Sequence, residues 1–315
     1  MKTKKARLKV IWTILRFIVP VALIGWLVWK TDWKTLWPLV RHIPGWVLLV
    51  SVLLFALAES VIAIRWQFLL RYQGLRVPFS RLWGLVFVGI FASNFLPSTI
   101  GGDAVKIGAI AQSPEKRGVA VASVVADRLY NVVSMALLLP LIMTLKGVSV
   151  PFLKHTEYLP VFGFAFLAGW PKLRERIQRN WNDIRQWFIT PRCIIPSVAL
   201  SWLSIGLAFG SFYIINYGMG VPITYWQAAG VSILTYFISL LPVSINGLGV
   251  QEGSRTYLLT LQGASLDQAI AVAFLIRLVT MAVSLLGGVR LLWGWRDLMK
   301  ARQAPGPESS EEQGE

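Results

Sequence analysis

Long apolar runs recur along the whole chain, and most are long enough to cross a bilayer as helices. A transmembrane helix needs about 20 apolar residues to span a hydrocarbon core about 30 Å thick. The pattern predicts spanning helices over residues 10–29, 45–64, 119–145, 193–217 and 268–293, and a shorter one over 158–170. The fold class that follows is all-α, a polytopic helical membrane protein.

Two other apolar runs are interrupted by Pro and Gly in the same way. FLPSTIGGD at 95–103 and LLPVSINGLG at 240–249 align at an offset of 145 residues. Broken backbone at membrane depth is tolerated only where protein covers it or where it lines a cavity. We therefore predict two re-entrant helical hairpins, each entering and leaving the bilayer on the same side. Their turn backbone is assigned to Pro97, Gly101, Gly102, Pro242, Gly247 and Gly249.

The matching hairpins divide the chain into two repeats, at 10–145 and 158–293, within one integral membrane domain at 1–298. For this topology the cytoplasmic segments hold 21 of the 31 Lys and Arg residues, against 6 in outside segments and 4 within spans. This bias places both termini in the cytoplasm. The second hairpin then enters from the opposite side, so the repeats are inverted, an arrangement typical of transporters. Residues 299–315 form an acidic cytoplasmic tail that we expect to be disordered.

Composition narrows the class of protein further. Of the 315 residues, 55% are hydrophobic and 15 are Trp, and the mean hydropathy is +0.59. No soluble catalytic domain remains outside the predicted spans. The net charge of +16 is spread over loops between spans, which favours contact with anionic lipid over nucleic-acid binding.

Charged residues within the apolar segments are the candidate chemistry, because a charge in a span is costly unless it is paired or hydrated. We assign a lipid-headgroup pocket to Glu59, Asp103, Lys106, Asp127, Arg128, Asn246, Glu252, Arg255 and Arg277. One interpretation is purely structural pairing, with Arg128 bound by Asp103 or Asp127. In the same interpretation Glu252 binds Arg277. The other interpretation is that Arg128 and Arg277, which align between the repeats, bind a lipid phosphate through their guanidinium forks.

Signatures of catalysis and of cofactor binding are missing from the sequence. NGLGVQEG lacks the spacing of a dinucleotide-binding loop, and there is no P-loop, HExxH or nucleophile elbow. Cys193 is the only cysteine, and His42 and His155 are far apart in predicted loops. We therefore assign no catalytic residue and expect no metal site and no cofactor. Two alternatives stay open: a membrane-embedded glycosyl- or phosphotransferase of lipid or cell-envelope synthesis, and a non-transporting membrane assembly protein.

The motifs FLPSTIGGDAVKI and LPVSINGLGVQEG, together with RWQFLLR and ADRL, resemble the flippase-like family. This family is the transmembrane region of lysylphosphatidylglycerol synthases and their stand-alone relatives, and the resemblance covers about residues 8–298. In the full synthases this region moves an aminoacylated lipid between leaflets, and a separate cytosolic domain makes that lipid. The resemblance implies the lipid-handling pocket without the aminoacylation.

The expected function is a membrane lipid transporter of a prokaryotic plasma membrane. It would move the headgroup of an anionic phospholipid or a polyprenyl-linked lipid between leaflets, while the acyl or prenyl chains stay in the bilayer. The expected partners are membrane lipids, and no nucleic acid is expected. A homo-oligomer and contacts with lipid-synthesis enzymes are left open.

Overall fold

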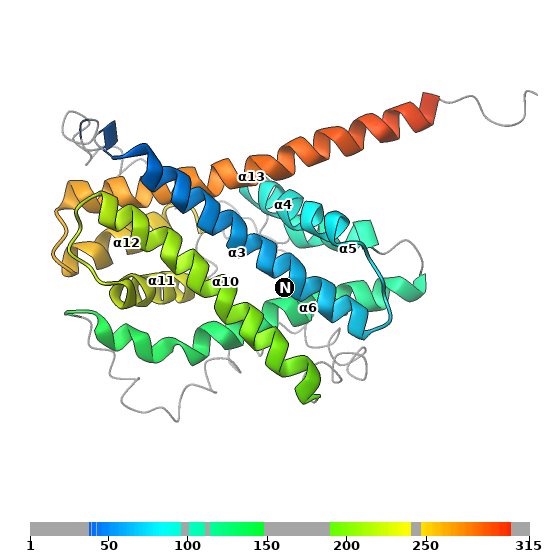
Figure 1. The fold of residues 1–315 in the computed structure, drawn as a ribbon, viewed down its shortest axis with the longest axis horizontal. Coiled ribbons are helices and arrows are strands. Elements are labelled where there is room, and N and C mark those ends of the chain that lie inside the picture. The colour runs from blue at the N-terminus through cyan, green and yellow to red at the C-terminus, as the bar shows by residue number, and fades with distance from the viewer. Residues whose placement is uncertain are drawn as a thin grey trace, which may run out of the picture.

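The computed structural model describes residues 38, 40–41, 43–95, 101–110, 114–147, 190–240 and 247–303. In these ranges the regular structure is helical and no strand occurs (Figure 1). The elements are α3 (Gly45–Tyr72), α4 (Phe79–Phe95), α5 (Gly101–Ile110), α6 (Pro114–Leu137), the 3-10 helix η1 (Leu139–Thr144), α10 (Pro191–Gly218), α11 (Tyr225–Ser239), α12 (Val250–Leu261) and α13 (Leu266–Gln303).

Four stretches in the described part of the chain are long and apolar enough to cross a membrane. They are Gly45–Tyr72, Gly118–Leu137, Pro191–Gly218 and Leu266–Leu291. Large apolar side chains such as Leu53, Leu203 and Leu285 remain exposed on them, as expected for surfaces that contact lipid tails. These helices confirm the prediction of an all-α, multi-pass membrane protein. The predicted spans at 10–29 and 158–170 lie outside the described residues.

Two pairs of shorter helices lie between the long ones. α4 is followed by α5 and α11 by α12, with interruptions at the two motifs that contain Pro and Gly. α5 has 10 residues and α12 has 12, too few to cross a hydrocarbon core of about 30 Å. Residues 96–100 and 241–246, which include Pro97, Pro242 and Asn246, lie outside the described residues. The re-entrant turns therefore stay a prediction.

The helices after residue 190 match those before residue 147 in order, and α10, α11 and α12 are within two residues of α3, α4 and α5 in length. α3 and α10 both have 28 residues, and six residues connect each of them to the next helix. The packing partners match as well: α3 contacts α4 and α6, and α10 contacts α11 and α13. Each half also contacts the last helix of the other half. α4 packs against α13, and α11 packs against η1, which follows α6 directly along the chain.

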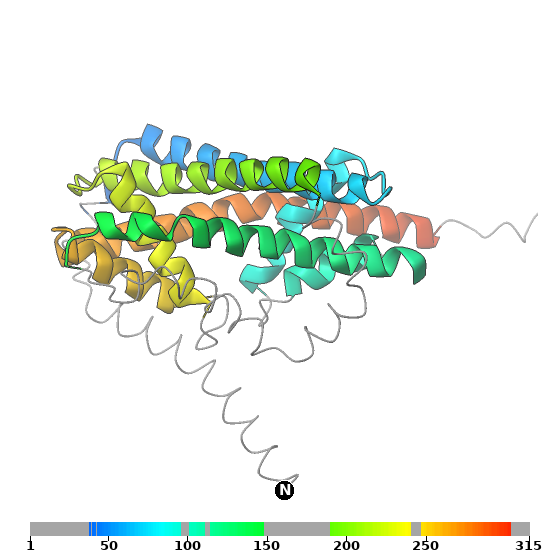
Figure 2. The same ribbon diagram turned by 90° about the horizontal axis from the view of Figure 1, so that it is seen from below.

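α3 and α10 pack side by side in opposite directions (Figure 1). Near the start of α3 and the end of α10, the Oγ atoms of Ser51 and Ser211 are 2.7 Å apart. Towards the other ends, Arg65 Nη1 donates to Ser201 Oγ. Figure 2 shows α3 and α10 together on one side of the molecule. α12 lies beside the start of α13, whereas α4 and α5 lie further along α13.

Three helices differ from their predicted bounds. α3 continues past residue 64 to Tyr72, because Arg65 is neutralised inside the protein by Asp127 and does not reach water. The span predicted at 119–145 is divided after Leu137, where Pro140 lacks the N–H that an α-helix needs and η1 begins. α13 continues to Gln303, so the first residues of the predicted tail are helical, and 304–315 lie outside the described residues.

Candidate functional site

Each short helix that follows an interruption carries an acid bound to an arginine of the next long helix. Asp103 Oδ2 and Oδ1 accept hydrogen bonds from Arg128 Nε and Nη2 at 3.1 and 3.0 Å. Glu252 Oε1 accepts a hydrogen bond from Arg277 Nε at 2.6 Å. Both pairs are separated by 25 residues along the chain. Of the two acids considered from the sequence, Asp103 is therefore the partner of Arg128, and Asp127 binds elsewhere.

The local sequence places both acids in the first turn of a helix. Asp103 lies in the first turn of α5 and Glu252 in that of α12, where the helix dipole favours a carboxylate. Glu252 Oε2 also accepts from the backbone N–H of Gly249 at 2.7 Å, so its two oxygens join the helix start to Arg277. Gly249 has a φ of 74°, a left-handed conformation that glycine adopts at little cost.

A second base follows each acid by three residues, about one helical turn. Lys106 Nζ lies 5.6 Å from the centre of the Trp66 ring, and Arg255 Cζ lies 5.9 Å from that of Phe212. Both distances are within the range of cation–π interactions. Trp66 and Phe212 are each the 22nd residue of their helix, α3 or α10.

Two equivalent sets of residues result. Module one is Trp66, Asp103, Lys106 and Arg128, and module two is Phe212, Glu252, Arg255 and Arg277. The arginines at the ends of these sets lie near the middle of the spans Gly118–Leu137 and Leu266–Leu291. Both modules therefore lie at membrane depth, where a charge is retained only with a partner or with water.

Among the described residues, module one has charged neighbours that module two lacks. Arg65, only 2% exposed, donates from Nε to Asp127 Oδ1 at 2.8 Å and from Nη2 to the Asp127 carbonyl oxygen. Glu59 on α3 interacts electrostatically with this pair and with both bases of module one. In the second half the residues at the matching positions are Ile205 for Glu59, Ser211 for Arg65 and Ile276 for Asp127.

The arginines of the two modules also differ in access. The Arg128 side chain is 57% exposed, whereas that of Arg277 is 12% exposed. An exposed guanidinium in the middle of a span is tolerated when it faces a water-filled recess and not lipid tails. Arg128 is therefore the most exposed charged side chain of module one.

Close backbone contact positions module one. A Cβ atom added to Gly102 would overlap the carbonyl oxygen of Gly89, and a Cβ on Gly89 would lie 2.9 Å from Lys106 Cε. α4 and α5 therefore touch backbone to backbone at the start of α5. The Lys106 side chain lies along this contact and reaches Trp66.

One side chain from the second half interacts with the charges of the first. Tyr236, near the end of α11, interacts electrostatically with Arg128 and Arg65. The end of α11 therefore approaches module one, although α11 belongs to the half of the chain that carries module two.

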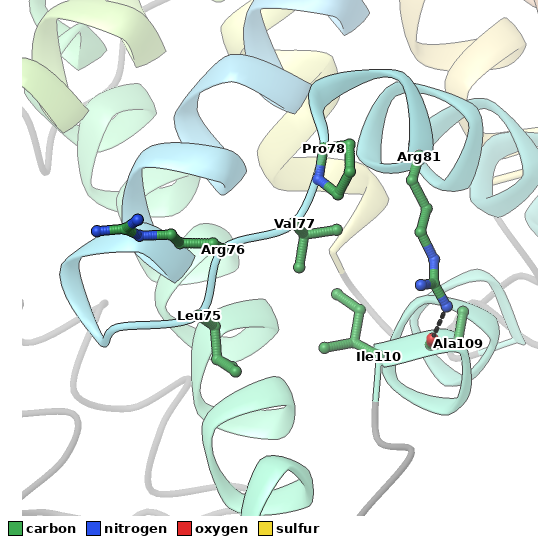
Figure 3. A pocket seen from close by; sticks show the side chains of 7 residues that line it. All are labelled: Leu75, Arg76, Val77, Pro78, Arg81, Ala109 and Ile110. Atoms are coloured by element: carbon green, nitrogen blue, oxygen red, sulfur yellow. Dashed lines mark hydrogen bonds between the residues drawn. The ribbon is translucent and has the colours of Figure 1, made fainter.

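A separate small pocket lies between the α3–α4 connection and the end of α5 (Figure 3). Its lining residues are Leu75, Arg76, Val77, Pro78, Arg81, Ala109 and Ile110. Arg81 Nη2 donates to the Ala109 carbonyl oxygen at 2.9 Å across it, and the Arg76 side chain points away. Arg81 thus joins the start of α4 to the last turn of α5, apart from both modules.

Eight of the nine residues predicted for the pocket lie in the described helices, and Asn246 lies outside them. Of the predicted turn residues, Gly101 begins α5, Gly102 makes the contact with α4, and Gly247 and Gly249 have positive φ. Sequence reasoning missed Arg65, Trp66 and Phe212. An offset of 146 residues, which superposes α10 on α3, aligns the two aromatic residues and could have found them.

In the described part of the chain, four helices of spanning length and paired charges at membrane depth define a polytopic α-helical membrane protein. The family model for the lysylphosphatidylglycerol synthase transmembrane region matches residues 13–288, and the chain belongs to this family. It is similar to the UPF0104 membrane protein PH1989 of Pyrococcus horikoshii, with 23% identity over 321 aligned positions. That alignment covers 88% of this chain and 96% of the relative.

Proposed function

We propose that this protein moves the headgroup of an anionic phospholipid or a polyprenyl-linked lipid between the leaflets of a membrane. The observation that carries the proposal is the repetition of one charged module in two halves whose matching helices α3 and α10 run in opposite directions. Each module holds an arginine near the middle of a span, where only a polar ligand, a counter-charge or water can accommodate it.

The chemistry of the modules suits a phosphate. A guanidinium donates two parallel hydrogen bonds to carboxylate or phosphate oxygens, so a lipid phosphate can replace the bound carboxylate with the same geometry. Arg128 binds Asp103 in this two-pronged way and is also the more exposed arginine. The acid keeps the arginine paired when no lipid is bound, and Lys106, which interacts electrostatically with Asp103, can balance the acid when a lipid phosphate takes its place.

The arrangement of the two halves supports transport. In transporters with inverted repeats, the two halves exchange conformations around a site near the midplane. The antiparallel packing of α3 and α10, at equivalent places in the two halves, favours such an inversion. At 1.5 Å per residue, α5 and α12 are about 15 and 18 Å long, roughly half of a bilayer core, which favours re-entrant hairpins.

The proposed location is a prokaryotic plasma membrane with both termini in the cytoplasm, as the distribution of Lys and Arg favours. Arg76, in the α3–α4 connection, is then cytoplasmic, and Lys146, after η1, is outside. Both side chains are exposed, whereas Cys193 is buried and gives little background to a thiol reagent. Arg76→Cys should react with an impermeant maleimide only from the cytoplasmic side and Lys146→Cys only from outside. Labelling of both variants from one side would contradict the topology.

Transport itself is tested by reconstitution into liposomes that contain fluorescent phosphatidylglycerol or a short polyprenyl phosphate. The wild type should exchange the lipid between leaflets, and Arg128→Ala and Arg277→Ala should each abolish most of the exchange. Arg76→Ala, which removes an exposed arginine outside both modules, is the matched control and should leave the rate unchanged. Unchanged exchange in both module variants would exclude the modules as the headgroup path.

A further inference from the structure

We infer that Gln262 is a latch, a polar contact that joins the two halves of the molecule at one membrane face and has to break during lipid transport. This is the face at which η1 ends and α12 turns into α13, here called the Lys146 face. In the proposed topology it is the outer face of the membrane. The inference rests on the function proposed above, because it names a contact that must separate when inverted halves exchange conformations.

The side chain of Gln262 pairs with the backbone of a residue in the other half. Its Oε1 accepts from the Lys146 N–H at 2.9 Å, and its Nε2 donates to the Lys146 carbonyl oxygen at 3.1 Å. Lys146 follows η1 in the first half, whereas Gln262 caps the end of α12 in the second half, 116 residues later. A primary amide can satisfy a backbone N–H and a backbone carbonyl at the same time. Gln262 is only 4% exposed, so both bonds are shielded from competing water.

The second half also encloses the preceding residues of the first half at this face. Thr144 Oγ1 lies 2.7 Å from the Leu141 carbonyl oxygen and 3.2 Å from that of Trp226 in α11, so its hydroxyl is shared between the halves. Leu145 is 6% exposed, and its Cγ would lie 3.1 Å from a Cβ on Gly230 of α11. The Lys146 face is therefore closed by hydrogen bonds and by tight packing.

A further contact between the halves, that of α4 with α13, is built from glycines. A Cβ on Gly287 would overlap the carbonyl oxygen of Phe87, and a Cβ on Gly288 would lie 2.9 Å from the ring of Phe91. Packed helices can slide over such a surface by small shear movements. In transporters with inverted repeats, one repeat moves against the other around the site. Opening of the Lys146 face breaks both bonds of Gln262, so Gln262 opposes this opening.

The first test measures whether this face opens more often when Gln262 cannot pair. Leu145→Cys places a thiol between the halves, and the full chain in liposomes is reacted with an impermeant maleimide. Gln262→Leu keeps most of the side-chain volume but makes no hydrogen bond. It should raise the alkylation rate about tenfold, which corresponds to the loss of about 1.4 kcal/mol of hydrogen bonding.

Gln268→Leu is the matched control for this measurement. Gln268 lies near Gln262 in sequence, but it binds Met219 and Ser265, which belong to its own half. Its loss should therefore leave the alkylation rate of Leu145→Cys unchanged. A general loosening of the protein would raise the rate in both glutamine variants.

The second test leaves Gln262 in place and prevents the halves from separating. Thr144→Cys and Trp226→Cys introduce two exposed thiols, one in each half, which the cleavable linker dithiobismaleimidoethane can join. The cross-linked protein should lose most of its exchange of fluorescent phosphatidylglycerol between leaflets, and reduction of the linker should restore it. Pro222→Cys with Trp226→Cys is the control pair, because both exposed positions lie in the second half, and its cross-link should leave exchange unchanged.

Three results would overturn the inference: an alkylation rate that Gln262→Leu does not raise, an equal rise with Gln268→Leu, or lipid exchange that persists in the cross-linked protein. The cross-link decides the matter if Gln262→Leu does not fold, as judged by gel filtration. Failure of the proposed function looks different, because the protein without a cross-link would then exchange no lipid. The alkylation rates would in that case still show whether Gln262 closes this face.

Discussion

Module one and module two share an acid, two bases and an aromatic ring, but they differ in their neighbours and in their access. Module one is surrounded by Glu59 and the buried Arg65–Asp127 pair, and its arginine is largely exposed. Module two has apolar residues or serine at the matching positions, and Arg277, which binds its acid, is mostly buried. The geometry of the ion pair is thus common to both halves, whereas the charge around it is not.

This difference indicates which ion pairs the packing of both halves requires and which ion pair occurs in one half only. The pair between a first-turn acid and an arginine joins each short helix to the following long one, so both halves contain it. The Arg65–Asp127 pair instead joins α3 to α6, and the second half makes the equivalent contact between α10 and α13 without charge. A charged contact is therefore not required at this place by the packing of the helices.

The largest expected effect tests that conclusion. Asp127→Asn leaves Arg65 buried without a counter-charge and should lower the free energy of unfolding by about 3–5 kcal/mol, measured by SDS titration. The double variant Arg65→Ser with Asp127→Ile copies the second half and should cost less than half as much. If the double variant is as unstable as the single one, the two halves are not interchangeable here.

The next effect compares the two arginines of the modules. Arg277→Gln leaves Glu252, 13% exposed, without its partner and should cost about 2–3 kcal/mol of unfolding free energy. Arg128→Gln should cost less, about 1–2 kcal/mol, because the Arg128 side chain is mostly exposed, although Asp103, 19% exposed, also loses its partner. The same SDS titration measures both variants, and equal losses would contradict the difference in access.

A third comparison concerns two matched glycines, Gly84 and Gly230, each the sixth residue of its helix, α4 or α11. A Cβ on Gly230 would lie 2.9 Å from the backbone oxygen of Leu141, which cannot easily move. A Cβ on Gly84 would meet only the flexible side chain of Arg290, at 3.1 Å.

Gly230→Ala should therefore lower the melting temperature in detergent by an amount equivalent to about 1–2 kcal/mol, as overpacking does. Gly84→Ala should have a smaller effect. Gly108→Ala, where a Cβ meets nothing within 4 Å, is the control and should not destabilise the protein. A Gly84 variant as unstable as the Gly230 variant would show that Arg290 is held rigidly.

The sequence was sufficient to predict the long described helices and to single out the charged residues of the two ion pairs, although it left open whether Asp103 or Asp127 binds Arg128. Hydrocarbon requires long apolar helices, and a charge within a span requires a partner, so Asp103, Arg128, Glu252 and Arg277 could be singled out. Arg65 could not, since a base just after an apolar run is typical of a cytoplasmic end. Its buried site arises from Asp127 and Ser201 on other helices, contacts that a linear pattern does not show.

The aromatic rings under Lys106 and Arg255 were missed for another reason. Trp66 and Phe212 are two of many aromatic residues in an apolar chain, so neither stands out alone. They become informative only when α10 is superposed on α3, which requires the bounds of both helices. Whether the pairs of short helices turn within the membrane stays a prediction, because the residues at both turns lie outside the described part of the chain.

The smallest expected effect concerns Arg81, the third residue of α4, whose counterpart in α11 is Gln227. Arg81 reaches across to the Ala109 carbonyl oxygen in the last turn of α5, where a cation is also favoured by the helix dipole (Figure 3). Gln227 instead completes the capping box at the start of its own helix with Thr224.

Arg81→Gln copies the second half and should cost about 0.5–1 kcal/mol, because one exposed hydrogen bond and one charge–dipole interaction are lost. Hydrogen exchange followed by mass spectrometry should show faster exchange confined to the last turn of α5, with α4 unchanged. Faster exchange throughout both helices would mean that Arg81 holds the pair of helices together and does not merely cap the end of α5. In that case the contact between α4 and α5 would depend on Arg81, whereas the contact between α11 and α12 has no such residue at the matching position. The two halves would then differ in how their short helices are joined as well as in their charges.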